Sequence, residues 1–175
     1  FGYITTGSKN GPASSGQGLE ADKFNSAVVD IQYNSWFGKA YSKLKQDNTE
    51  KVLVSNHIDS WECKSQNWSP VFRDEFTKRR GYDPVKYLPA MTGIPVESAE
   101  VSERFLNDIR ITISELICNN FLESYVKLIH SNKARFSAES IAPTVMCDGM
   151  AHYGKADVPM GEFWLQSPLH DKPND

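Results

Sequence analysis

The longest regular pattern in this sequence is an apolar stripe that runs from Ser98 to about Lys133. Its members recur every three or four residues, which places them on one face of an α-helix. They are Phe105, Leu106, Ile109, Ile113, Leu116, Ile117, Phe121, Leu128 and Ile129. A stripe this wide needs an apolar partner layer, and we expect the helix to pack on a β-sheet.

Short strand candidates alternate with long helices along the chain. The strand candidates lie at 1–5, 52–58, 135–139 and 156–162, and a second amphipathic helix lies at 26–46, after the capping candidates Asn25 and Ser26. Such alternation favours right-handed βαβ units, so the fold class is α/β with the four strands as parallel neighbours. Both long helices are expected on one outer face of the sheet.

Local signals refine this outline. The apolar run Val52-Leu53-Val54 is expected to begin the buried second strand, which leads into a loop rich in polar and aromatic residues. Two shorter helices follow it: one begins at Ser69-Pro70 and stops at Gly81, and the other begins at Asp83-Pro84 and ends before Gly93.

The sequence contains neither Gly-x-Gly-x-x-Gly nor Gly-x-x-x-x-Gly-Lys, the glycine motifs of nucleotide-binding sheets. We therefore predict a partial (β/α) TIM-type barrel with parallel strands and long outer helices. Because a complete barrel takes about 250 residues, residues 1–175 are expected to be a fragment of a single (β/α)-barrel catalytic domain. The unpaired strand edges of such a piece predict self-association, or contact with missing flanking segments of the same protein.

Composition narrows the function classes. The net charge is −3 and no long run of Lys and Arg is present, which argues against a nucleic-acid partner. No apolar stretch approaches the roughly 20 residues that a membrane span requires. The three cysteines, Cys63, Cys118 and Cys147, lack Cys-x-x-Cys spacing, and Cys118 falls on the apolar side of the long helix, as a small core residue would.

Three of the strand candidates place a glutamate near their carboxyl end: Glu62, Glu139 and Glu162. Parallel barrels gather their catalytic side chains at that end. Glycoside hydrolysis uses two carboxyl groups, one protonated to assist the leaving oxygen and one ionised to activate water or attack the sugar. The three acids are therefore candidate catalytic residues, with Glu62 as the first choice for the acid.

The surroundings of these acids suit a sugar. Trp61, Trp68 and Trp164 provide flat aromatic faces that could stack on sugar rings, and an apolar neighbour raises the pKa of a carboxyl group. His57 and Asp59, two apart on an extended segment, would point to one side and could bind substrate hydroxyls. The simpler interpretation is that the acids form ordinary ion pairs and the aromatic residues belong to the core.

Several separated runs, in this order, carry a resemblance to a known family. They are Gly18-Leu19-Glu20-Ala21-Asp22-Lys23, Asp59-Ser60-Trp61-Glu62, Trp68-Ser69-Pro70, Phe76-Thr77-Lys78-Arg79-Arg80-Gly81-Tyr82-Asp83, Tyr87-Leu88-Pro89, Ser102-Glu103-Arg104-Phe105-Leu106 and Pro159-Met160-Gly161-Glu162-Phe163-Trp164. Together they resemble the bacterial α-L-rhamnosidases of glycoside hydrolase family 106 and their close relatives over nearly the whole chain.

The resemblance implies a large multidomain bacterial protein, periplasmic or secreted, whose barrel hydrolyses a rhamnoside-type linkage of a plant or bacterial polysaccharide with inversion. It implies a calcium ion near the sugar, Glu62 as general acid and Glu162 as a further active-site acid. One departure concerns the sugar: where relatives often carry a Glu-Pro-Tyr-Gly-like run, this chain has Glu139-Ser140-Ile141-Ala142-Pro143.

Three alternatives remain open at the level of sequence. A retaining barrel glycosidase of other sugar specificity would hold its carboxyl groups about 5–5.5 Å apart, against about 6.5–9.5 Å for inversion. A non-catalytic carbohydrate-binding or assembly module would bind sugar without turnover. A metal-dependent hydrolase would bring His57, Asp59, Asp148 and His152 to within about 2.0–2.2 Å of one ion.

Overall fold

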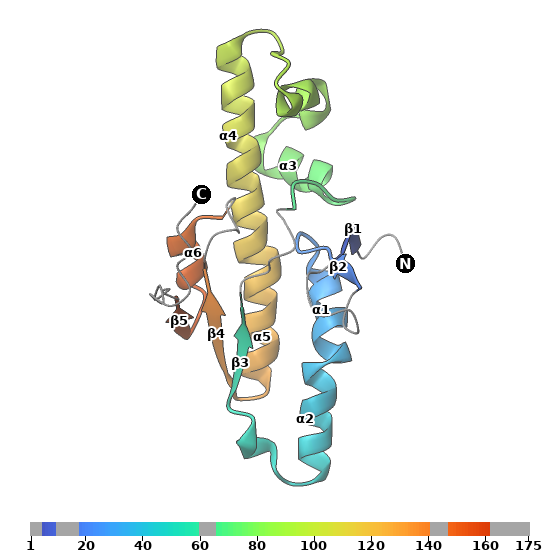
Figure 1. The fold of residues 1–175 in the computed structure, drawn as a ribbon, viewed down its shortest axis with the longest axis vertical. Coiled ribbons are helices and arrows are strands. Elements are labelled where there is room, and N and C mark those ends of the chain that lie inside the picture. Colours follow the sequence, from blue (N-terminus) through green and yellow to red (C-terminus); the bar gives the residue numbers. More distant parts are fainter. Residues whose placement is uncertain (1–4, 10–17, 60–65, 141–146, 162–175) are drawn as a thin grey trace, which may run out of the picture.

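A computed structural model describes residues 5–9, 18–59, 66–140 and 147–161 (Figure 1). The strands are β1 (Thr5–Lys9), β2 (Leu19–Ala21), β3 (Ser55–Ile58), β4 (Arg135–Glu139) and β5 (Val158–Met160). The α-helices are α1 (Ser26–Ser35), α2 (Phe37–Gln46), α3 (Phe72–Arg80), α4 (Ala99–Leu116), α5 (Glu123–Ser131) and α6 (Gly149–Tyr153). Two 3₁₀ helices, η2 (Glu50–Val52) and η3 (Pro84–Thr92), and a π-helical segment, η4 (Ile117–Leu122), complete the helical elements of the described residues.

The main sheet is parallel, as the alternation of strands and helices predicts. Its order is β3-β4-β5, with Ser55 opposite Arg135 and Ser137 opposite Val158. The outer edges of β3 and β5 pair with no strand among the described residues. This part of the molecule is therefore a mixed α/β unit built on a three-stranded parallel sheet.

The expectation for the N-terminal strand is wrong where the structure describes it. Of the segment 1–5, only Thr5 lies within the described residues, and it opens β1, which pairs antiparallel with β2. These two strands form a separate ribbon and do not join the main sheet. The short connection explains this difference, because a parallel pairing needs a long crossover whereas an antiparallel pair does not.

The long apolar stripe does form one continuous helical column (Figure 1). Ser98 caps it, since its hydroxyl accepts a hydrogen bond from the amide of Val101 at 3.1 Å. The column passes from α4 through the π-helical turn η4 into α5, and α5 packs against β4. Phe136 and Ala138, both fully buried, present the apolar face of β4 to the core.

The predicted helix at 26–46 is two helices, because the backbone of Trp36 leaves the helical region at φ −124° and ψ −82°. Asn25 caps α1 by accepting from the amide of Ala27 at 3.1 Å, as expected. The break lets each helix contact a different neighbour. Tyr33 of α1 donates to the carbonyl of Leu128 in α5, whereas Tyr41 of α2 reaches β3.

The apolar run at 52–54 also behaves differently from the prediction. Val52 and Val54 are exposed, and the strand begins only at Ser55. The buried position of β3 is instead Asn56, whose side-chain oxygen accepts the hydroxyl of Tyr41 at 2.9 Å. Hydrogen bonding, which hydrophobic patterning does not report, selects this residue for the interior.

The two short helices after β3 end where the sequence predicts. Helix α3 ends at Gly81 and η3 ends at Gly93, and both glycines have φ near +85°, a conformation that favours glycine. Both elements pack against α4 and form an aromatic cluster with it, described below. No helix among the described residues is long and apolar enough to cross a membrane.

Candidate functional site at the carboxyl end of the parallel sheet

The two faces of the sheet carry different kinds of residues and have different surroundings. Asn56, Phe136 and Ala138 face the helices and are buried there. Since successive strand residues alternate between faces, His57 and Ser137 occupy the opposite face. Their side chains confirm this: His57 Nδ1 lies 3.0 Å from Ser137 Oγ. In a closed barrel the face away from the helices would be the interior.

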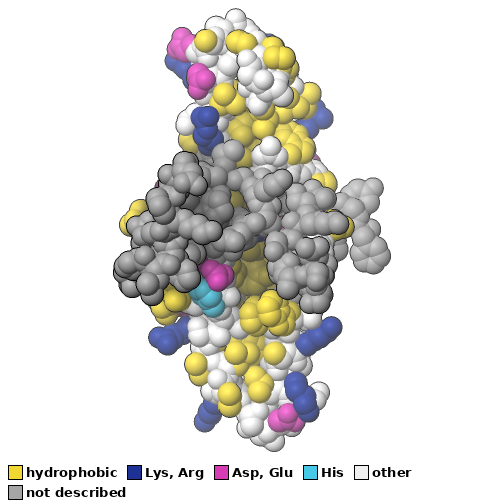
Figure 2. All heavy atoms as spheres, in the orientation of Figure 1, with side chains coloured by type: hydrophobic (Ala, Val, Ile, Leu, Met, Phe, Trp, Pro, Cys, Tyr) yellow, Lys and Arg dark blue, Asp and Glu magenta, His cyan; other side chains and the backbone are white. Residues whose placement is uncertain are grey.

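Two carboxylates follow this pair at the same level of the sheet. Asp59 comes directly after Ile58 and Glu139 directly after Ala138, and Ile58 and Ala138 are register partners. Both acids are two residues beyond the His57–Ser137 pair, so the pleat directs them to that same face. In the space-filling view, a histidine and an acidic side chain lie side by side near the centre of this face (Figure 2). The carboxyl ends of β3 and β4 therefore bring together His57, Asp59 and Glu139.

Glu139 is the buried acid of this group. Its side chain is only 6% exposed, whereas Asp59 and His57 are exposed. On its other side, Glu139 is register partner to Met160 of β5. A carboxylate at this depth, at the carboxyl end of a parallel strand, can act as an acid or base on a ligand or bind its hydroxyl groups.

The remaining sequence-predicted residues are placed less completely. Glu62, Glu162, Trp61 and Trp164 lie outside the described residues, so their roles stay predictions. Trp68 is half-buried, and its ring centroid lies 4.8 Å from that of Phe72 in the core. At least one face of this tryptophan is thus used for packing.

A hydrogen-bonded clamp at Gln66 was not predicted from the sequence. The Gln66 amide nitrogen donates to Asp22 Oδ1 at 2.6 Å, and its oxygen accepts from the backbone amide of Lys23 at 3.0 Å. Asp22 is 1% exposed and Lys23 is 3% exposed, and Lys23 also pairs with Glu20. The run Gly18–Lys23 could have indicated this clamp in the sequence, because it contains two acids and a lysine and is one of the motifs that carry the family resemblance.

The metal-hydrolase alternative finds no support in the described residues. His57 and Asp59 belong to the end of β3, whereas Asp148 caps α6 and His152 lies within that helix. Burial lowers the pKa of His152 to about 4, so its imidazole is neutral at ordinary pH. Within residues 5–9, 18–59, 66–140 and 147–161, no group of three or more His, Cys, Asp or Glu side chains could hold a metal ion.

Comparison with known proteins assigns the chain to a family. The family model for glycoside hydrolase family 106, described as alpha-L-rhamnosidase, matches residues 1–174. The chain belongs to glycoside hydrolase family 106. This family membership confirms the resemblance that the separated sequence motifs indicated.

Two relatives of this family 106 chain extend the comparison. The "Putative beta-glucuronidase" of Formosa agariphila is 37% identical over 175 residues, which are 99% of this chain and 15% of that protein. The solved structure of a rhamnosidase from Novosphingobium sp. PP1Y superposes with a TM-score of 0.72 and 28% identity, covering 94% of this chain and 16% of that one. The chain thus spans about one sixth of the length of each.

Proposed function

We propose that this family 106 chain is part of the catalytic barrel of a glycoside hydrolase that cleaves rhamnoside-type or related linkages in plant or bacterial polysaccharides. One observation carries the proposal: His57, Asp59 and Glu139 lie at the carboxyl ends of two neighbouring parallel strands, at the same level and on the same face of the sheet. We call this end of the sheet the sheet edge. Parallel (β/α) enzymes build their sites at this end. Family membership provides independent support.

The mechanism that we infer uses two carboxyl groups with inversion. Glu62 donates a proton to the departing glycosidic oxygen, and a second carboxylate removes a proton from the water that attacks the opposite face of the sugar. Glu162 and Glu139 are the candidates for that second role. The burial of Glu139 at the sheet edge supports Glu139 in this role, while the Gly-Glu-Phe-Trp run supports Glu162.

The neighbouring residues would bind and orient the sugar. His57 and Asp59 are exposed on the same face as Glu139 and can hydrogen-bond ring hydroxyls. We propose Trp61, Trp68 and Trp164 as stacking surfaces for the carbohydrate. Ser137 holds His57 through its hydroxyl and so fixes the imidazole relative to Glu139.

The sheet also supports completion of a TIM-type barrel. Because β3 and β5 have open outer edges within the described residues, further strands from the flanking parts of a longer protein could extend both sides. Val52 and Val54, which immediately precede β3, are exposed hydrophobic residues and suit a surface covered in the complete protein. We infer a periplasmic or secreted location from the family resemblance.

Calcium belongs to this proposal on the family resemblance alone. The described residues contain no cluster of His, Cys, Asp or Glu that could hold an ion, so they do not themselves supply a carboxylate ligand set. We assign no catalytic step to the metal. If a calcium ion supports the fold of the site, dialysis of the complete protein against a chelator will lower its thermal unfolding temperature, and added Ca²⁺ will restore it.

The acid role is tested with Glu62→Gln in the complete protein. General acid assistance is worth about 10²–10⁴-fold, so turnover of a natural linkage with a poor leaving group will fall by that factor. An activated aryl glycoside, whose leaving group needs no proton, will be affected much less. Glu103→Gln is the matched control, because Glu103 is exposed on α4 and outside the sheet edge. Equal losses on both substrates would contradict the acid role.

Stereochemistry tests the rest of the mechanism. Proton NMR of the first sugar released from an aryl α-L-rhamnoside will show the inverted anomer before mutarotation. Retention would replace the inverting mechanism with a nucleophilic one and would predict carboxyl groups about 5–5.5 Å apart. Binding of rhamnosides without turnover in the complete protein would favour the non-catalytic binding module.

The name of the Formosa relative supports a second candidate function, hydrolysis of a β-glucuronide. The departure at Ser140, after Glu139, is compatible with a different sugar. Matched aryl α-L-rhamnoside and aryl β-D-glucuronide substrates decide between the two. Our first proposal predicts the higher kcat/KM on the rhamnoside, and the reverse order would establish the second.

A further inference from the structure

A groove of about 740 Å³ lies between α4 and α6, and two cysteines line it. His57, Asp59 and Glu139 are not among its lining residues. Cys118 belongs to the π-helical turn η4, and Cys147 immediately precedes Asp148, the N-cap of α6. Their sulfur atoms are 3.9 Å apart although 29 residues separate them in sequence. Neither forms a disulfide in this structure.

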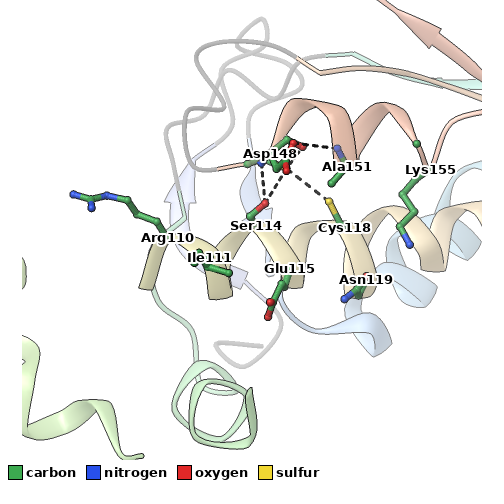
Figure 3. A pocket seen from close by; sticks show the side chains of 11 residues that line it. Arg110, Ile111, Ser114, Glu115, Cys118, Asn119, Asp148, Ala151 and Lys155 are labelled. Carbon is green, nitrogen blue, oxygen red and sulfur yellow. Dashed lines mark hydrogen bonds between the residues drawn. The ribbon is translucent and has the colours of Figure 1, made fainter. Parts of the chain in front are cut away.

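The contact is held in place from both sides. Ser114 of α4 accepts the backbone amide of Asp148 at 2.8 Å, and its hydroxyl lies 3.9 Å from the sulfur of Cys147. Asp148 in turn caps α6 through the amides of Met150 and Ala151. Figure 3 shows Ser114, Cys118 and Asp148 grouped between the two helices. The two thiols therefore face each other across a fixed junction.

Electrostatics distinguishes the two sulfurs. The hydrogen bond from Cys147 lowers the pKa of Cys118, and the positive charge of Lys155 acts in the same direction against burial and Asp148. The hydrogen bond to Cys118, together with burial, raises the pKa of Cys147. These opposite directions favour Cys118 as the thiolate that attacks first in thiol–disulfide exchange.

We propose that Cys118 and Cys147 are a disulfide-forming pair that links η4 to the start of α6 when the protein meets a small disulfide such as oxidised glutathione. The thiolate of Cys118 attacks one glutathione sulfur, which breaks the S–S bond and releases one glutathione thiolate. Cys147 then loses its proton to that thiolate or to water and attacks the Cys118 sulfur, releasing the second glutathione. Two protein thiols are oxidised and one glutathione disulfide is reduced to two thiols.

Two features make this exchange feasible. The groove lined by both cysteines is open to solvent, which gives a small disulfide a route to Cys118 although that residue is only 4% exposed. The sulfurs must approach from 3.9 Å to about 2.05 Å. The chain segment closed by the new bond contains α5 and β4, so the bond would restrain the strand that ends at Glu139. The proposal does not depend on any catalytic activity.

Peptide mapping of the complete protein tests the bond directly. After equilibration with oxidised glutathione, alkylation and non-reducing proteolysis, the Cys118 and Cys147 peptides should appear as one species, two hydrogens lighter than the separate pair and cleaved by dithiothreitol. Cys63→Ser should retain this species. Cys147→Ser should abolish it and leave glutathione on Cys118. Full alkylation of both cysteines, or a link of either to Cys63, would overturn the proposal.

Hydrogen exchange provides a second, local readout. Amides of α6 should exchange at least about tenfold more slowly in the oxidised protein than in the reduced one, because the bond restricts local opening. Amides of α3, which adjoins neither cysteine in the chain, should be unchanged, and Cys147→Ser should show no redox difference. Equal exchange of α6 in both redox states would contradict the link to that helix.

Discussion

The sheet edge and the aromatic layer of α3, η3 and α4 use their buried positions in opposite ways. At the edge, Asn56, Ser137 and Glu139 are all buried polar residues. In the aromatic layer, Phe76 is fully buried, with its ring centroid 5.1 Å from that of Tyr82 and 6.0 Å from that of Phe105. Buried polar groups stabilise less than well-packed rings. The carboxyl end of the sheet is the part for which we propose chemistry, and the aromatic layer is the part that we expect to stabilise the structure around it.

Two polar side chains of the aromatic layer, those of Arg80 and Tyr82, form hydrogen bonds with α4. Arg80 donates to the buried hydroxyl of Thr112 at 2.9 Å and pairs with Glu115. Tyr82 donates to Asp108 at 2.8 Å, and burial followed by this hydrogen bond raises the pKa of Tyr82. Such contacts fasten α3 and η3 to the long helix. The comparison predicts that substitutions at the edge change activity, whereas substitutions in the layer change stability.

The largest effect is expected from Glu139→Gln in the complete protein. The amide keeps the size of the side chain but cannot exchange a proton at the catalytic pH, so kcat should fall by about 10²–10⁴-fold. Circular dichroism should show an unchanged fold. Wild-type activity would remove Glu139 from the reacting groups, and loss of folding would mean that the edge is also essential for stability.

Phe76→Ala should have the converse effect. Emptying a fully buried ring site costs about 3–5 kcal/mol, which native-state hydrogen exchange of α4 amides will report as a lower local free energy of opening. The kcat of the folded protein should stay unchanged. Val85→Ala, a substitution of a 44% exposed residue of η3, is the control and should cost less than about 0.5 kcal/mol. A large loss of kcat without loss of stability would contradict the division between the two regions.

Gln66→Ala tests the hydrogen-bonded clamp at Gln66, which we expect to affect both stability and activity. It removes the hydrogen bonds of the side chain to Asp22, Lys23 and Trp68. The buried Asp22 carboxylate then loses one donor and keeps the backbone amide of Phe24, at a cost of about 1–3 kcal/mol. Gln66 follows Glu62 by four residues, so kcat should fall by about tenfold through mispositioning. Asn67→Ala, at an exposed neighbour, is the control. If the clamp acts as one unit, Asp22→Asn combined with Gln66→Ala will be less than additive.

The smallest effect is expected from Asp157→Asn. Its carboxylate accepts the amide of Phe136 at 2.7 Å and lies 2.8 Å from His130 Nε2, and these contacts lower the pKa of Asp157, the amide most strongly. The stabilisation is therefore present above the unfolded pKa of about 4 and is lost as pH falls through the lower folded pKa.

Because Asp157 is partly exposed, the contribution should stay below about 1 kcal/mol. The urea midpoints of wild type and Asp157→Asn should differ at pH 7 and converge near pH 3, whereas Asp30→Asn, on the exposed side of α1, should match wild type at both. A difference that grows toward low pH would contradict the direction of the pKa shift.

Helix boundaries were the most predictable feature of this chain. Asn25, Ser98, Gly81 and Gly93 mark the ends of helices because capping and left-handed turns depend on a few neighbouring residues. The parallel pairing of β3, β4 and β5 was predictable too, since strands that alternate with helices favour crossover connections between parallel neighbours. Family membership was indicated by the separated motifs and confirmed by the comparison.

Burial of polar residues was not predictable in the same way. Val52 and Val54 are exposed, whereas Asn56 is buried and accepts a hydrogen bond from Tyr41, fifteen residues earlier. The Gln66 clamp joins residues more than forty positions apart. Hydrophobic patterning records local periodicity and contains no information on which distant donor will satisfy a polar group.

By itself, the sequence determined the alternation of strands and helices, the ends of the helices, the family and the set of acids near the strand ends, because each depends on local patterns or on ordered motifs. Only the tertiary structure decided which side chains share a face and a level. That choice depends on register: one residue of slip would send His57 and Glu139 to the helix side of the sheet. Register depends on the packing of β4 against α5 and on its pairing with β3 and β5, which no single segment encodes.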